Sequence, residues 1–209
     1  AKRSTKRARG AVVNIPRRLG PFGRKSTRTL HYSTTVTMSV TTGVGAYQFS
    51  CNGMYDPDIT GTGHQPMGFD QLMALFNHYV VNSASISVVA LDTWAGTAPT
   101  VTAALVVAPD TTIIGGYDIN AACERQGARY KTMDLDAGRA TLRQTWKAKD
   151  YFGAASLAGM RGTATANPGE QSYFQLYVDD PNLSSYSMKW RVNIYYNASF
   201  YEPVAFVSS

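Results

Sequence analysis

The chain has 209 residues, which is enough for one domain with a sizeable core and too few for two domains of ordinary size. Hydrophobic residues make up 44% of it and charged residues only 16%, a charged fraction that is low for a soluble monomer, so we expect neighbouring molecules to cover much of the surface. The 2 cysteines are too few for a disulfide framework or a zinc cluster, and no apolar run approaches the roughly 18 residues that span a bilayer. The composition therefore excludes a disulfide-rich scaffold and a protein with membrane-spanning helices.

The formal net charge of +6 is divided unevenly along the chain. Residues 1–28 carry 10 basic residues and no acid, whereas residues 29–209 carry 10 basic and 14 acidic residues, a charge of −4. A basic segment with few apolar residues cannot bury enough surface to order itself, so we expect a basic arm over residues 1–28 that needs a polyanion. Phosphate backbones fit this need, because each Lys or Arg that pairs with a phosphate releases condensed counterions. The predicted nucleic-acid-binding residues are Lys2, Arg3, Lys6, Arg7, Arg9, Arg17, Arg18, Arg24, Lys25 and Arg28.

Two other interpretations of the basic arm stay open: a solvated tail, and a nuclear-import signal, for which Lys2 to Arg9 would serve. Import is compatible with nucleic-acid binding. Pro16 and Pro21, together with the neighbouring glycines, rule out a long regular helix, so the arm is expected to follow an extended, irregular path.

Period-two alternation of apolar and polar residues begins at Thr29, continues through Thr41, and returns over residues 186–200. Six further candidate strands cover residues 47–51, 79–92, 100–108, 128–134, 139–149 and 172–179. Short helices are expected at residues 70–76 and 119–125, the second with Asp118 as N-cap. Eight strands without regularly interleaved helices predict an all-β fold, a single eight-stranded antiparallel jelly-roll sandwich over residues 29–209.

Residue types that carry chemistry are present but do not form a catalytic pattern. Cys51 lies near His64, Asp70 and His78 in sequence, yet it follows an apolar run and reads as a small core residue rather than a stabilised thiolate. The three histidines lack the spacing of a zinc site, and no glycine-rich nucleotide-binding motif occurs. We therefore predict no catalytic residue, no metal site and no cofactor.

Paired carboxylates in turn-like settings admit one alternative. Asp179, Asp180 and Asn182 are explained most simply as turn-forming residues, but oxygen-rich clusters at subunit contacts also bind calcium. Calcium at subunit contacts therefore stays open.

One predicted strand, residues 139–149, has a basic outward face. Its outward residues are Arg139, Arg143, Lys147 and Lys149, and its inward residues are Ala140, Leu142, Trp146 and Ala148. Such a face suits contact with nucleic acid, contact with an acidic neighbouring subunit, or simple solubility of an exposed strand.

A resemblance to a known family is carried by residues 52–71, which read NGMYDPDITGTGHQPMGFDQ, and continues through residues 72–79 and 83–88. These segments resemble capsid proteins of small circular Rep-encoding single-stranded DNA (CRESS-DNA) viruses of the circovirus type. The stretch GTGHQP at residues 61–66 is the specific part, and with the basic arm and the strands the likeness spans most of the chain.

The resemblance implies a jelly roll whose copies, about sixty in the simplest icosahedral arrangement, close a shell with the basic arm facing inward. It implies a virion location with assembly in the host nucleus, a structural role for His64, Gln65, Pro66 and Phe69, and no enzymatic activity, because replication in the family belongs to a different protein. DNA is favoured over RNA by the resemblance alone. Contacts with host import machinery and a host receptor stay open, and no membrane partner is expected.

The predicted function is thus a viral capsid protein that self-assembles and packages single-stranded nucleic acid. The first alternative is a cellular single-strand nucleic-acid-binding β-barrel module, which would stay monomeric or form small oligomers. The second is an enzyme or lectin on a jelly-roll scaffold, which would need a converging polar pocket.

Overall fold

The computed structural model describes residues 23–40, 44–91, 100–112, 119–134, 140–153, 159–179 and 186–205. The strands in this part of the chain are β1 (Lys25–Val40), β2 (Val44–Ser50), β3 (Phe76–Leu91), β4 (Thr100–Ala108), β5 (Arg129–Asp134), β6 (Thr141–Lys147), β7 (Tyr173–Asp179) and β8 (Tyr186–Pro203). The helices are α1 (Phe69–Met73), α2 (Ile119–Glu124) and α3 (Ala148–Phe152). Among the described helices, none has the length and apolar character needed to cross a membrane.

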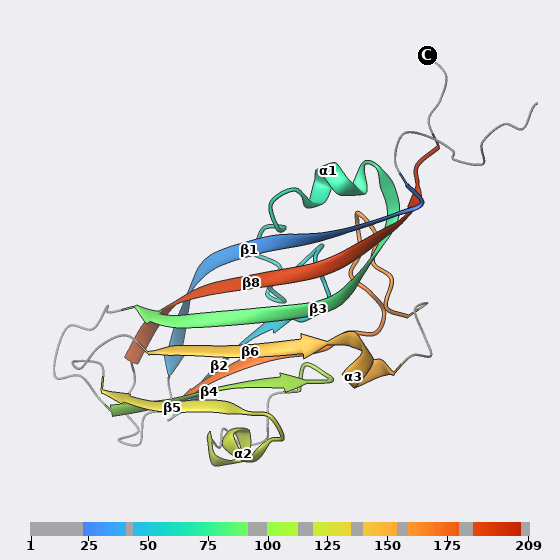
Figure 1. Cartoon of the computed structure of the whole chain (residues 1–209). Coiled ribbons are helices and arrows are strands. Elements are labelled where there is room, and N and C mark those ends of the chain that lie inside the picture. The colour runs from blue at the N-terminus through green and yellow to red at the C-terminus, as the bar shows by residue number, and fades with distance from the viewer. Residues whose placement is uncertain are drawn as a thin grey trace, which may run out of the picture.

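The eight strands form two four-stranded antiparallel sheets that pack face to face (Figure 1). One sheet, here called the long sheet, has the order β1-β8-β3-β6, and the other, the short sheet, has the order β2-β7-β4-β5. In each sheet, strands distant in sequence lie side by side, as in the double Greek key of a jelly roll. The predicted jelly-roll fold is therefore confirmed.

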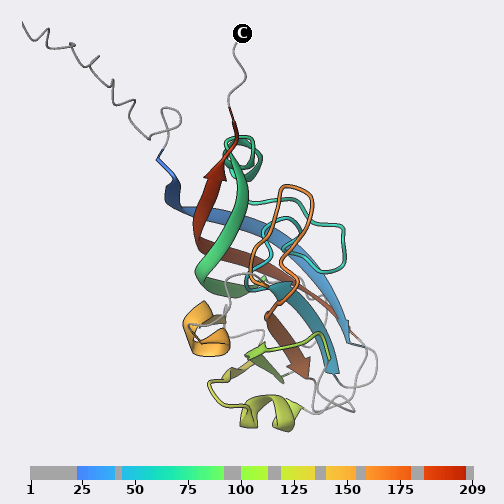
Figure 2. The same ribbon diagram turned by 90° about the vertical axis from the view of Figure 1, so that its right-hand side faces the viewer.

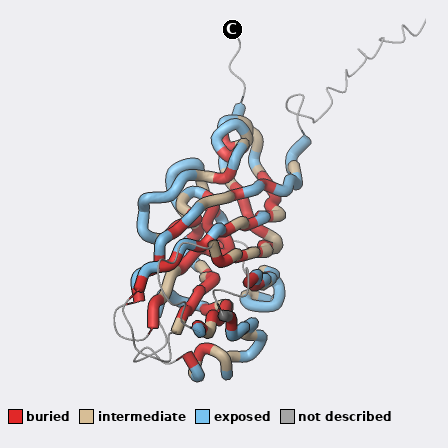
Figure 3. Tube along the Cα trace, turned by 90° about the vertical axis from the view of Figure 1, so that its left-hand side faces the viewer, coloured by how far each residue is buried: buried red, intermediate tan, exposed pale blue. Residues whose placement is uncertain are grey.

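The core lies between the two sheets and is built from the inward residues of each strand. Tyr32, Ile86 and Trp190 of the long sheet and Phe174 and Leu176 of the short sheet are fully buried. On β1 and β8 the buried and exposed residues alternate as the sequence pattern predicts, because successive side chains of a strand point to opposite faces. Figure 3 shows these buried stretches running through the middle of the sandwich.

Helix α2 covers the outer face of the short sheet (Figure 2). Its buried residues Ile119 and Ala122 pack against Ala104 and Val106 of β4 and Tyr177 of β7. These central strands are thus buried on both faces, which explains why they read as continuous apolar runs rather than alternating ones. The expected N-cap, Asp118, lies outside the described residues.

Several boundaries differ from the predicted ones, and the length of β8 explains the two early starts, those of β1 and β3. The sequence pattern predicts strands beginning at Thr29 and Tyr79, but β1 begins at Lys25 and β3 at Phe76. Strand β8 continues to Pro203, so its last residues supply backbone partners for Lys25 on one side and Phe76 on the other. The last four residues of the basic arm thus belong to the sheet. The helix predicted over residues 70–76 ends earlier, at Met73, because Phe76 already belongs to β3.

The loops at one end of the sandwich are joined by buried hydrogen bonds around Tyr79. The Met54 amide donates to the Tyr79 hydroxyl at 3.0 Å, and the backbone of Gly162 pairs with that of Tyr79 at 3.0 and 2.9 Å. Burial raises the pKa of Tyr79 to about 12, so its hydroxyl stays protonated at neutral pH. Phe69 lies edge-on against the ring of Tyr79, with 5.4 Å between centroids. Pro66, three residues before Phe69 in the sequence, is also buried. This packing agrees with the structural role predicted for Pro66 and Phe69.

The close approach of Gly162 to Tyr79 predicts that Gly162→Ala destabilises the fold. A Cβ at this position would overlap the ring of Tyr79, whose hydrogen bonds hold it in place. We expect the free energy of unfolding to fall by about 1–3 kcal/mol, the usual range for overpacking. Chemical denaturation measures this change. Gly169→Ala is the control, because a Cβ there meets only the carbonyl oxygen of Gly159 at 3.9 Å; equal stability of the two variants would contradict the prediction.

Candidate nucleic-acid interface

The basic residues predicted from the arm fall into two groups. Lys2, Arg3, Lys6, Arg7, Arg9, Arg17 and Arg18 lie outside the described residues. Arg24, Lys25 and Arg28 lie at the start of β1, and all three are exposed. Lys25 Nζ lies 5.0 Å from the ring centroid of Tyr201, and Arg28 Nη1 donates to the Thr27 carbonyl at 2.9 Å. The arm therefore joins the sandwich at the end of the long sheet where β8 finishes.

The predicted basic strand at residues 139–149 is partly confirmed. Arg143 and Lys147 are exposed on β6, opposite the buried Leu142 and Trp146. Arg139 lies outside the described residues.

Lys149 is not on the strand, because β6 ends at Lys147 and the chain turns into α3, which the sequence pattern did not predict. Lys147 pairs with Ser83, where β3 shifts register between Val81 and Ser83. The strand therefore stops where its partner becomes irregular. Ala148 lies partly buried against the core at the start of α3.

Pairing across the long sheet places Arg143 and Lys147 of β6 on the same face as two basic residues of β8, Lys189 and Arg191, that sequence reasoning did not single out. In the β3–β8 ladder, Lys189 pairs with Leu91 and Arg191 pairs with Val89. In the β3–β6 ladder, Arg143 pairs with Ser87, two residues from Val89 along β3. Both basic side chains are exposed, on the face opposite the core residue Trp190. The alternation of β8 already marks them as outward residues, but only the strand order reveals that they share a face with β6.

This outer face of the long sheet carries basic and polar side chains and, on β3, the partly buried Val89 and Leu91. The four strands contain 6 basic residues and a single acid, Glu202. Of the basic residues, Lys25, Arg143, Lys147, Lys189 and Arg191 lie on the outer face, whereas Arg28 pairs with the core residue Ala198. Glu202 lies at the far end of β8, where its carboxylate is 3.5 Å from Nη1 of Arg161. Between the basic residues the face carries short hydrogen-bonding side chains: Thr29, Ser33, Thr35, Thr37, Ser83, Ser85, Ser87, Thr141, Thr145, Asn193 and Asn197.

An aromatic pair lies near the centre of the same face. The rings of His31 on β1 and Tyr195 on β8 stack at 4.4 Å between centroids with 7° between their planes. His31 Nε2 lies 3.2 Å from the side-chain oxygen of Asn193, which fixes the imidazole orientation. Tyr195 is 46% exposed, so part of this aromatic side chain is accessible to a further planar group.

The short sheet differs in both charge and accessibility. Its four strands hold 2 basic and 2 acidic residues, so they carry no net charge. Helix α2 packs on its outer face, as described above.

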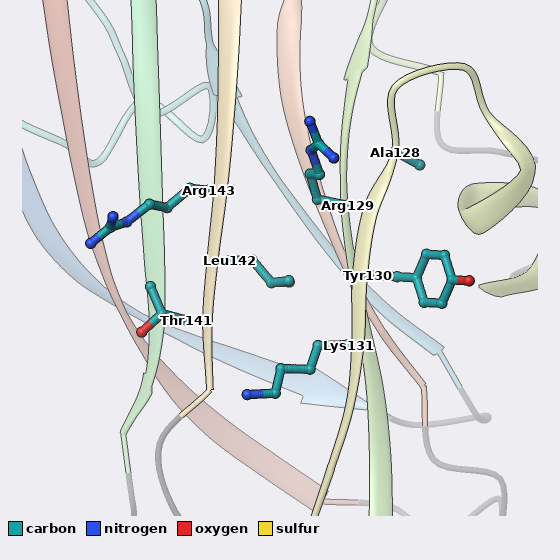
Figure 4. A pocket seen from close by; sticks show the side chains of 7 residues that line it. All are labelled: Ala128, Arg129, Tyr130, Lys131, Thr141, Leu142 and Arg143. Atoms are coloured by element: carbon teal, nitrogen blue, oxygen red, sulfur yellow. The ribbon is translucent and has the colours of Figure 1, made fainter.

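Between the edge strands β5 and β6 the sandwich opens into a groove of about 380 Å³ (Figure 4). Its lining residues are Ala128, Arg129, Tyr130, Lys131, Thr141, Leu142 and Arg143. Figure 4 shows Arg143 and Leu142 on opposite sides of β6, and Arg129 and Lys131 on the side of β5 that faces Leu142, with Tyr130 on its other side. The three cations therefore do not converge on one point, and the groove is the open edge of the sandwich rather than a closed pocket.

The residues considered for nucleophilic chemistry are held in structural roles. Cys51 is fully buried in the core, and burial raises the pKa of its thiol well above the usual value, which disfavours a thiolate. Both ring nitrogens of His64 lie against backbone carbonyls, Gln65 O at 2.8 Å and Ser33 O at 3.0 Å, so this side chain connects its loop to β1.

Metal-binding side chains do not gather in the described ranges, where no group of three or more His, Cys, Asp or Glu is placed to hold a metal ion. Asp179 pairs with Val44 and Thr102 at the end of β7. Asp180 and Asn182, the other residues considered for calcium, lie outside the described residues.

No protein-family model and no curated protein matches the chain. Solved structures similar to it include that of Desmodium yellow mottle tymovirus (14% identity, TM-score 0.46, 94% of this chain and 99% of that chain covered). The decameric BFDV capsid protein is similar at 9% identity and TM-score 0.49, covering 86% of this chain and 100% of that chain. A semi-empty virus-like particle of the prawn Macrobrachium rosenbergii nodavirus is similar at 10% identity and TM-score 0.46, covering 90% and 100%. Likeness at these values does not bear on function, which has to be inferred from the residues of this chain.

The buried position of Cys51 predicts that its thiol is inert in the folded protein. In a Cys123→Ser variant, which leaves Cys51 as the single cysteine, we expect negligible reaction with a disulfide reagent such as DTNB at pH 8 and one equivalent on adding guanidinium. The release of thionitrobenzoate measures both values. Rapid reaction of the native variant would contradict the core assignment and reopen a nucleophilic role for Cys51.

Proposed function

We propose that this chain is a viral capsid protein that self-assembles into a small icosahedral shell and packages single-stranded nucleic acid through its basic arm. The observation that carries the proposal is the division of charge: 10 basic residues without an acid over residues 1–28, joined to a jelly-roll body of charge −4. Such an arm is suited to neutralising phosphates without reading sequence, which is what packaging a genome requires. DNA is preferred to RNA here only because of the family resemblance in residues 52–71.

The body has surface features that suit repeated contacts between copies. Large apolar side chains are exposed at several separate places: Tyr130 on β5 (63% exposed), Tyr151 on α3, and Met67 (87% exposed) and Tyr55 in the loop before α1. Aromatic residues and methionine are enriched at protein interfaces. Contacts on several sides of one subunit are what a closed shell needs, since each copy meets different neighbours through different surfaces.

In this proposal the chain acts in the virion as one of about sixty identical subunits, with assembly in the host nucleus and no enzymatic role. Neutralisation of phosphates by the arms would couple shell closure to the uptake of nucleic acid. Host import machinery and a receptor are further partners consistent with such a particle.

A cellular single-strand-binding module is the second candidate, and the exposed stack of His31 and Tyr195 is the observation that favours it. Sheet-borne aromatics are the usual platform in such modules. The two candidates differ in assembly, since the module would remain a monomer or a small oligomer that binds oligonucleotides.

The charge of the arm predicts the nucleic-acid content of purified particles. In an arm variant with Lys2, Arg3, Lys6, Arg7, Arg9, Arg17 and Arg18 all changed to Gln, we expect particles or subunits that retain the fold but lose most nucleic acid, because about seven phosphate contacts are removed. The ratio of absorbance at 260 and 280 nm across the size-exclusion peak measures this loss. Residues 23–28 are kept, because β1 begins at Lys25.

The matched control replaces the five arginines of this set by lysine, which keeps the charge and the length. It should package nucleic acid as the unchanged chain does. Equal nucleic-acid content in the glutamine variant and in this control would overturn the role of the arm.

A further inference from the structure

The outer face of the long sheet is unusual for an exposed sheet face because its strands contain several basic residues and a single carboxylate, and none of the described helices lies across it (Figure 1). Lys189 and Arg191 of β8 and Arg143 and Lys147 of β6 are exposed on it, while the one acid of these strands, Glu202, lies at the far end near Arg161. Like charges spread over one face repel each other, so a face of this kind is stabilised by a polyanion.

The remaining side chains of the face suit a single-stranded nucleic acid in particular. Tyr195 and His31 present a stacked aromatic surface on which a base can stack, and stacking of this kind does not depend on base identity. The Nε of Arg191 donates to Thr35 Oγ1 at 3.0 Å, which anchors the guanidinium on the sheet and leaves its terminal nitrogens for a phosphate. The surrounding Ser, Thr and Asn residues add hydrogen-bonding groups for phosphate and sugar oxygens.

The basic arm meets the sandwich on this face. Lys25, the first residue of β1, pairs with Tyr201, which in turn pairs with His78 across β8, so the three residues form the end row of the outer face. Lys25 Nζ lies over the Tyr201 ring on that row. A nucleic-acid strand bound by the arm therefore reaches the long sheet at the end where β8 finishes, and Lys147, Arg143, Arg191 and Lys189 follow in this order toward the other end. The outer side of the short sheet is covered by α2.

We propose that the outer face of the long sheet is a second nucleic-acid-binding surface, on which a base stacks against Tyr195 while Lys189, Arg191, Arg143 and Lys147 contact phosphates. It rests on the proposed function for its ligand, the single strand recruited by the arm. In an assembled shell this surface would face the interior and contact the packaged single-stranded nucleic acid.

The charge contribution is tested by Lys189→Gln with Arg191→Gln in the full-length chain. The matched control is Arg129→Gln with Lys131→Gln, which removes one Lys and one Arg at the same two-residue spacing from β5 of the short sheet. Binding of a fluorescein-labelled oligothymidylate is followed by anisotropy over a range of NaCl concentrations. We expect the slope of log affinity against log salt to fall by about 1.4 for the β8 variant, about 0.7 for each phosphate contact, and to stay unchanged for the β5 variant.

The stacking contribution is tested at Tyr195. Tyr195→Ala should weaken oligothymidylate binding at least about fivefold, whereas Tyr195→Phe, which keeps the ring, should bind like the unchanged chain. In the same protein, photo-cross-linking with an oligonucleotide that contains 5-iodouracil should label Tyr195 or His31 in addition to the arm. Equal binding by the Ala and Phe variants, with cross-links confined to residues 1–28, would overturn the proposal.

The outcomes separate this proposal from the role of the arm. If the β8 variant binds and packages like the β5 control while the glutamine arm variant loses nucleic acid, the sheet surface is refuted and the proposed function stands. If the β8 variant loses nucleic acid and the arm variant does not, the sheet surface is supported and the arm is not the packaging element. If the β8 variant binds oligothymidylate normally but fails to assemble, the face is a contact with a neighbouring subunit, and the proposal is wrong.

Discussion

The structure depends most on the antiparallel pairing of β8 with strands on both of its sides. Strand β8 (Tyr186–Pro203) pairs with β1 from Tyr186 to Tyr201 and with β3 from Lys189 to Pro203. Its inward residues, among them Trp190 and Tyr196, fill the centre of the core, and burial of such large apolar side chains is the main favourable contribution to folding. Because neighbouring residues on a strand point to opposite faces, the same pairing fixes the outward residues Lys189, Arg191 and Tyr195 in one plane.

The two sides of the long sheet are thus set by one constraint but serve different purposes. The inner side is apolar and is covered by the short sheet, while the outer side carries basic residues, short polar side chains and the stack of His31 on Tyr195. The basic arm joins this outer side through Lys25, at the end where β8 finishes, and the basic residues of β6 and β8 lie farther along the same face. In the proposed capsid, this arrangement gives each subunit a basic side for the genome and leaves its other surfaces for neighbouring subunits.

Much of this arrangement is predictable from local sequence pattern, and the remainder needs long-range pairing. Alternation over β1 and β8 identified the inward Trp190 and the outward Arg191 because period two reports directly which face a residue occupies. The early starts of β1 at Lys25 and of β3 at Phe76 could not be predicted, since they depend on the distant end of β8. That Arg191 and Arg143 lie on neighbouring rows of one face likewise follows from the strand order β8-β3-β6, which no local pattern encodes.

If copies of this chain close into a shell around nucleic acid, electron microscopy of the purified full-length protein should show uniform round particles of one diameter, with internal density. A homogeneous monomer or small oligomer, under conditions where oligonucleotides bind tightly, would rule out the shell and favour a cellular single-strand-binding module.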